Sequence, residues 1–269
     1  MGAVYLWELR KLRAQKRTYL GLGATVLVPV AFVVALAVQH GAGPTDVPLG
    51  RALRDTGLAI PFVVLFFMSI WGLPLVTALV AGDIVASESH NGTLKTILTR
   101  SRERGQVFAG KTCAAATYTL IALFAMVALG VAAGVIEFGW HPLTSLSGTK
   151  VAPLTGLGLL ALSSLVYAWP LLAIAAFGLM LSTVTRNSAA SVVGTLMFAL
   201  LMQLIGALPG TEPIRPYLLG EQFSAWHGLL RRPTDWAPIE RAAWVCALYA
   251  VASLCAGYLV FLRRDVTGD

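Results

Sequence analysis

One stretch of this chain has the residue types and spacing of a phosphate-binding loop. From Gly105 to Thr112 it reads G-Q-V-F-A-G-K-T and matches G-x-x-x-x-G-K-[ST], in which backbone N–H groups and the lysine bind nucleotide phosphates. Such a loop must follow a buried strand and precede the N-terminus of a soluble helix. Here a basic run at residues 99–104 comes before the pattern and a long apolar segment follows it. The sequence therefore predicts that the match is accidental and that this chain itself holds no nucleotide or other cofactor.

Other residues that could do chemistry are not grouped into a catalytic or metal-binding pattern. Neither H-E-x-x-H nor G-x-S-x-G occurs. The four histidines are scattered over predicted loops: His40, His90, His141 and His227. The three cysteines lack metal-ligand spacing and fall in or beside apolar segments, which predicts small buried apolar residues: Cys113, Cys246 and Cys255. We therefore expect neither an enzyme nor a metal site.

Ionisable residues are missing from the interiors of the apolar segments. These interiors contain Ser, Thr, Tyr and Gln203 but no Asp, Glu, Lys, Arg or His. This composition weighs against a proton- or ion-coupled transporter, whose relays use carboxylates or histidines within the membrane. The nearest acids are Asp83 and Glu88, directly after the second apolar segment, where one interpretation is that water solvates them.

The elements that must position these residues are apolar helices. Hydrophobic residues make up 57% of the 269 residues and charged residues 12%, against about 45–50% and about 25% in soluble domains. Six segments are long enough to cross a bilayer: 19–39, 58–82, 112–136, 155–184, 188–208 and 243–262. The predicted fold class is an all-α polytopic membrane protein with six transmembrane helices. Residues 1–269 then form one transmembrane domain.

The basic residues are distributed unequally between the two sides of this predicted bundle. Thirteen of the 20 Lys and Arg residues fall in the N-terminal segment, the 83–111 loop, the short turn before residue 188 and the C-terminal tail. The remaining seven lie on the opposite side. The positive-inside rule places the first side, with both termini, in the cytoplasm. Because orientation explains the net charge of +7, a nucleic-acid partner is not needed.

Three local features have open interpretations. Residues 1–18 are predicted to form an amphipathic interfacial helix, although a charge cluster that only stops translocation would have the same composition. Four prolines interrupt apolar segments, as functional kinks or as tolerated packing: Pro29, Pro61, Pro74 and Pro170. Small residues four apart allow close helix approach, within the chain or in a dimer: Gly130 with Gly134, and Ala190 with Gly194.

The layout resembles the permease subunits of type-2 ATP-binding-cassette (ABC) exporters, in the group of multidrug, antibiotic-resistance and bacteriocin-immunity permeases. Residues 88–100 read E-S-H-N-G-T-L-K-T-I-L-T-R and are similar to the acidic, G-T, apolar and basic run that follows the second span in these permeases. The short turn around Arg186 and the external segment 209–242 are similar in position to two further family features. For 209–242 the resemblance implies short, partly re-entrant helices before the last span.

The resemblance implies that the 83–111 loop couples the permease to a separate ATPase. Two ATPase subunits would hold ATP and Mg²⁺, and a second permease chain, a copy or a homologue, would complete the complex in the lipid bilayer. An Asn91-Gly92 turn would lead into a short helix capped by Thr93 and ending near Leu98. The expected coupling residues are Glu88, Gly92, Thr93, Leu94, Lys95, Ile97, Leu98 and Arg186.

Within this loop, the apolar side chains would form a ridge and the charged ones its polar rim. Leu94, Ile97 and Leu98 form the expected ridge. The rim consists of Glu88, Lys95 and Arg100. The other interpretation is that the loop only anchors the chain by its positive charge. The resemblance implies export of a hydrophobic or amphipathic substrate (a drug, antibiotic, peptide or lipid) across a bacterial-type cytoplasmic membrane. The alternative is a non-transporting scaffold or sensor subunit that binds a cytosolic partner.

Overall fold

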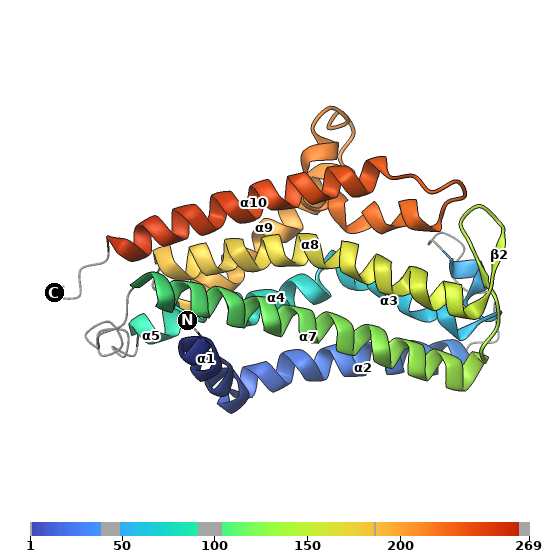
Figure 1. Cartoon of the computed structure of the whole chain (residues 1–269), viewed down its shortest axis with the longest axis horizontal. Coiled ribbons are helices and arrows are strands. Elements are labelled where there is room, and N and C mark those ends of the chain that lie inside the picture. Colours follow the sequence, from blue (N-terminus) through green and yellow to red (C-terminus); the bar gives the residue numbers. More distant parts are fainter. Residues whose placement is uncertain (1, 39–48, 91–103, 186, 264–269) are drawn as a thin grey trace.

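The computed structural model describes residues 2–38, 49–90, 104–185 and 187–263 as an elongated bundle of helices (Figure 1). The helices, in chain order, are α1 (Gly2–Ala14), α2 (Lys16–Val38), α3 (Ile60–Ile70), α4 (Gly72–Ala81), α5 (Ala86–His90), α7 (Arg104–Phe138), α8 (Pro153–Thr185), α9 (Ser188–Ala207) and α10 (Ala237–Leu262). Short 3₁₀ helices are η1 (Gly50–Ala52), η2 (Gly57–Ala59), η3 (Arg215–Tyr217) and η4 (Glu221–Leu230). One small hairpin, β1 (Leu143–Thr144) and β2 (Lys150–Val151), is the exception to the all-α prediction.

Five helices are long and apolar enough to cross a membrane: α2, α7, α8, α9 and α10. Helices α2, α8 and α9 begin and end within a few residues of the predicted segments. Helix α10 ends as predicted but begins earlier, at Ala237. Helix α7 is longer than predicted, because it begins at Arg104 rather than at residue 112. The chain is therefore a helical protein with several candidate membrane-spanning helices.

The second predicted span, 58–82, is broken rather than continuous. Its two parts, which contain α3 and α4, belong to the helical segments Gly57–Ile70 and Gly72–Glu88, and these are bent by 60° relative to each other at Trp71. Pro74 explains the position of the break, because it has no N–H to donate to the carbonyl of Ile70 and its ring would clash with that carbonyl. Helices α2 and α8 run through Pro29 and Pro170. Pro74 thus marks a break, whereas the prolines of α2 and α8 are accommodated.

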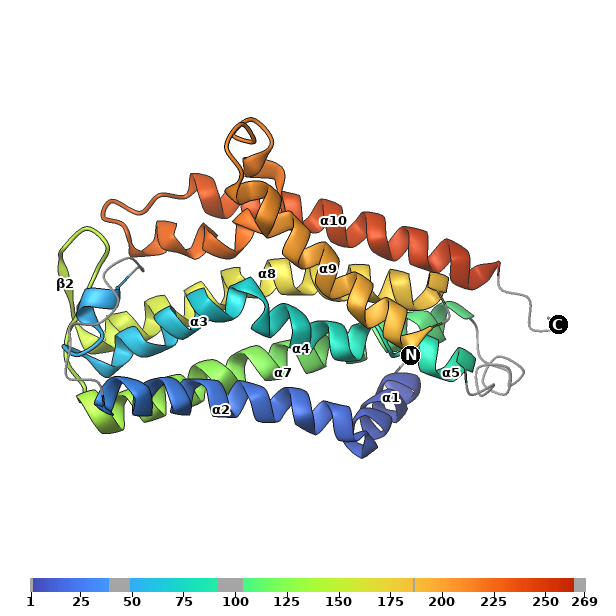
Figure 2. The ribbon, with the colours of Figure 1, turned by 180° about the vertical axis from the view of Figure 1, so that it is seen from behind.

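Helix α8 lies at the centre of the bundle, between α10 and α7 in Figures 1 and 2. Of the apolar stretch of α8 that is long enough to cross a membrane, 67% is buried inside the chain, whereas the corresponding figure for α9 is 17%. The outer faces of α9 and α10 expose large apolar side chains such as Met197, Leu201 and Leu248. Exposed apolar faces of this length are expected for helices in contact with lipid or with another membrane protein.

The glycine pair of α7 packs within the chain. A Cβ on Gly134 would lie 2.4 Å from the carbonyl oxygen of Gly57, and one on Gly130 would lie 3.3 Å from Pro61. These two glycines therefore allow α7 to approach η2 and α3 closely. They do not contribute to a dimer face.

Most helix ends lie at one of the two ends of the bundle, whereas α9 ends near the middle, where Gln203 donates hydrogen bonds to the carbonyls of Ser69 and Ile70 (Figures 1 and 2). Helices α1 and α5, the starts of α7 and α9 and the end of α10 share one end. The hairpin and η2 lie at the other end, with the start of α8. The elements at the first end are those that the sequence placed on one side, but the end of α9, expected at the opposite end, stops short of it. The helix predicted for residues 1–18 is shorter than expected: α1 ends at Ala14, and residues 16–18 already belong to α2. Helix α1 packs on α7, and Leu12 and Val107 belong to the same buried apolar cluster.

Candidate functional site: a buried charge cluster at one end of the bundle

Lys111, on α7, is a lysine with no exposed surface. Its ammonium group lies 3.0 Å from Oε1 of Glu8 on α1 and 2.7 Å from Oε2 of Glu88 on α5. It also donates a hydrogen bond to the backbone carbonyl of Ile84 at 3.1 Å. A buried ammonium is tolerated only when it is paired and hydrogen-bonded. Lys111 therefore joins three separate elements at one point.

Lys11 is the second cation of this group. It pairs with Glu8 at 3.1 Å, contacts Glu88 Oε1, and lies 4.2 Å from the centroid of the Trp7 ring. Burial, together with the neighbouring charge of Lys111, lowers the pKa of Lys11 to about 8. Glu8 and Glu88 are 1% and 6% exposed, so two carboxylates and two ammonium groups form a compact, formally neutral set.

Asp83 extends the group toward α2 and α9. Its side chain is 2% exposed, pairs with Arg17 of α2, and accepts a hydrogen bond from the hydroxyl of Ser188 at the start of α9. We refer to the following residues as the charge cluster: Glu8, Lys11, Arg17, Asp83, Glu88, Lys111 and Ser188. The charge cluster connects α1, α2, α5, α7 and α9.

A serine of α8 holds the N-terminus of α5. The hydroxyl oxygen of Ser182 accepts hydrogen bonds from the backbone N–H groups of Val85 and Ala86, at 3.1 and 2.9 Å. The first N–H groups of a helix have no partner within it, and here a side chain from another helix supplies one. Helix α5 is therefore fixed at its N-terminus by α8 and through Glu88 by α1 and α7.

The structure corrects two expectations for acidic residues. Glu88 does not lie on an exposed rim, and Asp83 and Glu88 are not solvated. The reason is that the two carboxylates form ion pairs with basic side chains instead of being hydrated by water. These side chains are Lys11, Lys111 and Arg17. The other predicted coupling residues lie outside the described part of the chain: Gly92, Thr93, Leu94, Lys95, Ile97, Leu98 and Arg186.

Sequence reasoning missed Glu8, Lys11 and Lys111 as members of a site. One signal was present, because Glu8 is the single acid in a basic N-terminal helix and lies three residues before Lys11. The sequence did not show that Glu8 and Lys11 lie beside Lys111, because Glu8 and Lys111 are 103 positions apart in the chain. Pairing over such a distance depends on how α1 packs on α7.

The nucleotide-like pattern lies inside α7. Residues 105–112 are helical, whereas a phosphate-binding loop wraps its backbone N–H groups around the phosphates. Lys111 points to glutamates, and Thr112 donates a hydrogen bond to the carbonyl of Phe108 at 3.0 Å. A Cβ on Gly110 would lie 2.8 Å from the side chain of Val4, so this glycine lets α1 approach α7. Helix packing therefore accounts for the pattern, and the lack of nucleotide binding stays a prediction.

The histidines and cysteines do not form a metal site in the parts of the chain that the structure describes. Cys246 is buried, as predicted. The prediction of burial is wrong for Cys113 and Cys255, which are exposed on the outer faces of α7 and α10. Apolar helices of a bundle have an outer face as well as a core face, and hydropathy alone does not separate them.

Comparison with known families gives one match. A family described as "Protein of unknown function (DUF2705)" matches residues 30–267. A search of curated proteins found no match. The family match covers α3 to α10 and the C-terminal part of α2, together with Asp83, Glu88, Lys111 and Ser188, while Glu8, Lys11 and Arg17 precede it. Because the match spans most of the 269 residues, the chain belongs to the DUF2705 family.

Proposed function

We propose that this chain is the membrane permease subunit of a type-2 ABC exporter. In this proposal the broken pair α3 and α4 is the second of six spans, and the end with the charge cluster faces the cytoplasm, where both termini lie. Two copies of a separate ATPase hydrolyse ATP below two permease chains. The substrate is hydrophobic or amphipathic, in keeping with the apolar character of the helices.

The observation that carries the proposal is the attachment of α5. This helix leads directly into residues 91–103, the loop that the proposal assigns to the ATPase. A loop that served only as a positive anchor would need no buried contacts. Instead, Glu88 pairs with buried Lys111, and Ser182 holds the helix start. A displacement of the loop would therefore be transmitted through α5 to α1, α7 and α8.

The distribution of basic residues indicates which end of the bundle faces the cytoplasm in this proposal. The end of the bundle with the charge cluster is the one where the sequence places thirteen of the 20 basic residues. By the positive-inside rule it contacts the cytoplasm, where ATP is available. The interiors of the apolar segments lack ionisable residues, so the energy for transport is expected from outside the bilayer.

Reconstitution with an ATPase tests the proposal. The chain is co-expressed with a candidate ABC ATPase from the same organism, and the pair is purified into lipid vesicles. We expect the two proteins to co-purify, ATP hydrolysis to depend on the permease, and a fluorescent amphipathic compound to move across the vesicle membrane only with ATP. Co-purification without ATP-dependent transport would favour the scaffold alternative. Failure of the ATPase to bind would contradict the proposal.

A further inference from the structure

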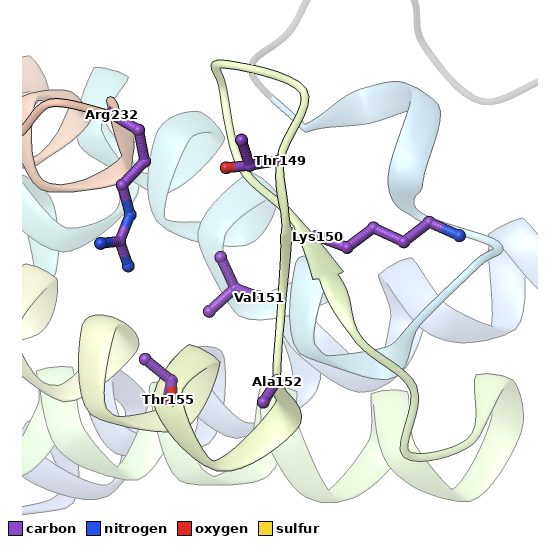
Figure 3. Close-up of a pocket in the computed structure, with 6 residues that line it drawn as sticks. All are labelled: Thr149, Lys150, Val151, Ala152, Thr155 and Arg232. Carbon is purple, nitrogen blue, oxygen red and sulfur yellow. The ribbon is translucent and has the colours of Figure 1, made fainter.

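A cavity lies at the end of the bundle opposite the charge cluster. Its volume is about 410 Å³, and it opens between the β1–β2 hairpin, the start of α8 and the segment that connects η4 to α10 (Figure 3). Six residues line it: Thr149, Lys150, Val151, Ala152, Thr155 and Arg232. None of these residues belongs to the charge cluster or to the predicted coupling loop.

Two hydrogen bonds hold the walls of this cavity together. The backbone N–H of Leu146 donates to the carbonyl of Leu230 at 3.1 Å, and the N–H of Arg232 donates to the hydroxyl of Ser147 at 2.8 Å. The hairpin turn is itself closed by Gly148, with φ of +79°, which only glycine adopts readily. The cavity is therefore a preformed feature between tied segments.

The cavity presents positive charge without a neutralising acid. Arg232 extends from one wall toward Thr155, while the ammonium of Lys150 points away on the other side of the strand (Figure 3). Neither side chain makes an ion pair with a residue in the described ranges. The adjacent Arg231, in contrast, lies 3.6 Å from Asp235. Arg232 is thus a guanidinium available to an anion.

The groups around Arg232 suit phosphate oxygens. Thr155 contributes its hydroxyl group to the lining, whereas the hydroxyl of Thr149 lies 2.7 Å from that of Ser145 and closes the hairpin. Helix α8 begins at Pro153, so backbone N–H groups of its first turn lie beside Thr155 and have no partner within the helix. A guanidinium binds phosphate oxygens through two parallel hydrogen bonds, and hydroxyl and amide donors complete such sites.

Neighbouring side chains indicate the depth of the cavity in a membrane. Trp140 follows α7 and Trp236 precedes α10, and both indole rings are exposed at this end of the bundle. Leu154, directly before Thr155, is 77% exposed. Tryptophan is enriched where the acyl chains meet the headgroups, and an exposed leucine is suited to acyl chains. The cavity therefore lies at headgroup level.

We propose that this cavity binds the phosphate group of an anionic phospholipid, with Arg232 as the main ligand. Thr155 and the first turn of α8 donate further hydrogen bonds, and Leu154 contacts an acyl chain. Inorganic phosphate shares the chemistry recognised by these donors. This proposal does not depend on the exporter function, because the cavity lies at the end of the bundle opposite the charge cluster.

The test compares two adjacent arginines. The full chain is purified in a neutral detergent, and binding of dihexanoyl phosphatidylglycerol and of inorganic phosphate is titrated by calorimetry. The variants are Arg232→Gln and, as the matched control, Arg231→Gln, which removes an arginine paired with Asp235 and outside the lining. Because hydrogen bonds to charged groups stabilise more than neutral ones, we expect Arg232→Gln to weaken binding roughly tenfold and Arg231→Gln to leave it unchanged.

The two ligands distinguish the source of the phosphate. Phosphatidylglycerol binding that inorganic phosphate displaces only at a much higher concentration supports a lipid site, and is the expected result. Displacement by an equal concentration of inorganic phosphate would overturn the lipid assignment. Equal losses in Arg232→Gln and Arg231→Gln, or no binding of phosphatidylglycerol by the wild-type chain, would overturn the proposal altogether.

Discussion

At the scale of single residues, the main finding is that the lysine of an apparent nucleotide motif is a structural cation. Lys111 is buried between Glu8 and Glu88, and its ammonium group neutralises two carboxylates that would otherwise be buried without sufficient countercharge. Desolvation of two acids and one base is unfavourable in isolation, so the set holds together only as a unit. Removing one member should therefore cost more than removing a matched pair.

We predict that Lys111→Met destabilises the protein by about 3–5 kcal/mol, because it leaves Glu8 and Glu88 with Lys11 as their one remaining ammonium partner. The double variant Glu8→Gln with Lys111→Met should recover part of this loss. Thermal unfolding in detergent measures both. Lys16→Met is the control, since Lys16 is an exposed lysine of α2 and should lie within about 0.5 kcal/mol of the wild type. A Lys111 variant as stable as this control would contradict the role of the cluster.

The lowered pKa of Lys11 predicts an unusual pH dependence of its reactivity. Between about pH 8 and pH 10.5 its amine is largely neutral and nucleophilic, whereas an unperturbed lysine is still protonated. Acylation of Lys11, followed by mass spectrometry, should reach half its maximum near pH 8. Because the charge of Lys111 lowers this pKa, Lys111→Met should move the midpoint to higher pH. An unchanged midpoint in that variant would mean that the two lysines do not interact.

At the scale of elements, α5 is short but fixed from several sides. Five residues cannot form a stable helix alone, since helices of that length are marginal in water. The hydroxyl of Ser182 and the ion pairs of Glu88 supply what the helix lacks. Helix α7 shows the opposite case, because it continues past the apolar segment into polar sequence. Pairing of Lys111 with two glutamates makes that extension possible.

Ser182→Ala should loosen the start of α5. The variant leaves the N–H groups of Val85 and Ala86 without their acceptor, and such a loss costs about 1–3 kcal/mol. Hydrogen exchange at these two amides should be at least tenfold faster. Ser163→Ala is the control, because Ser163 is an equally buried serine of α8 whose hydroxyl has no hydrogen-bond partner in the described residues. Equal exchange rates in the two variants would show that Ser182 does not hold α5.

At the scale of the whole molecule, the fold was largely predictable and the site was not. Runs of apolar residues fixed the lengths of α2, α8 and α9, because a helix in a membrane must satisfy its backbone within itself. Hydropathy could not show that Pro74 breaks the second span while Pro170 is tolerated, since both outcomes are compatible with a proline among packed helices. The burial of Asp83 and Glu88 was not predicted either. Both acids follow an apolar segment in the sequence, but the basic residues that pair with them come from α1, α2 and α7.

In the proposed exporter, the charge cluster transmits movement of the 91–103 segment to the helices. Glu88→Gln tests this most directly, because it keeps the shape of the side chain and removes the charge that pairs with Lys111 and Lys11. Glu137→Gln is the matched control, as Glu137 is an exposed glutamate near the opposite end of α7.

The decisive measurement is the number of substrate molecules transported per ATP hydrolysed by each variant in vesicles that also contain the proposed ATPase. We predict that Glu88→Gln still binds the ATPase but transports at least tenfold less per ATP, whereas Glu137→Gln matches the wild type. Leu94→Asp, in the loop itself, should instead lose the ATPase on purification. A Glu88→Gln complex with the wild-type ratio of transport to hydrolysis would contradict the account.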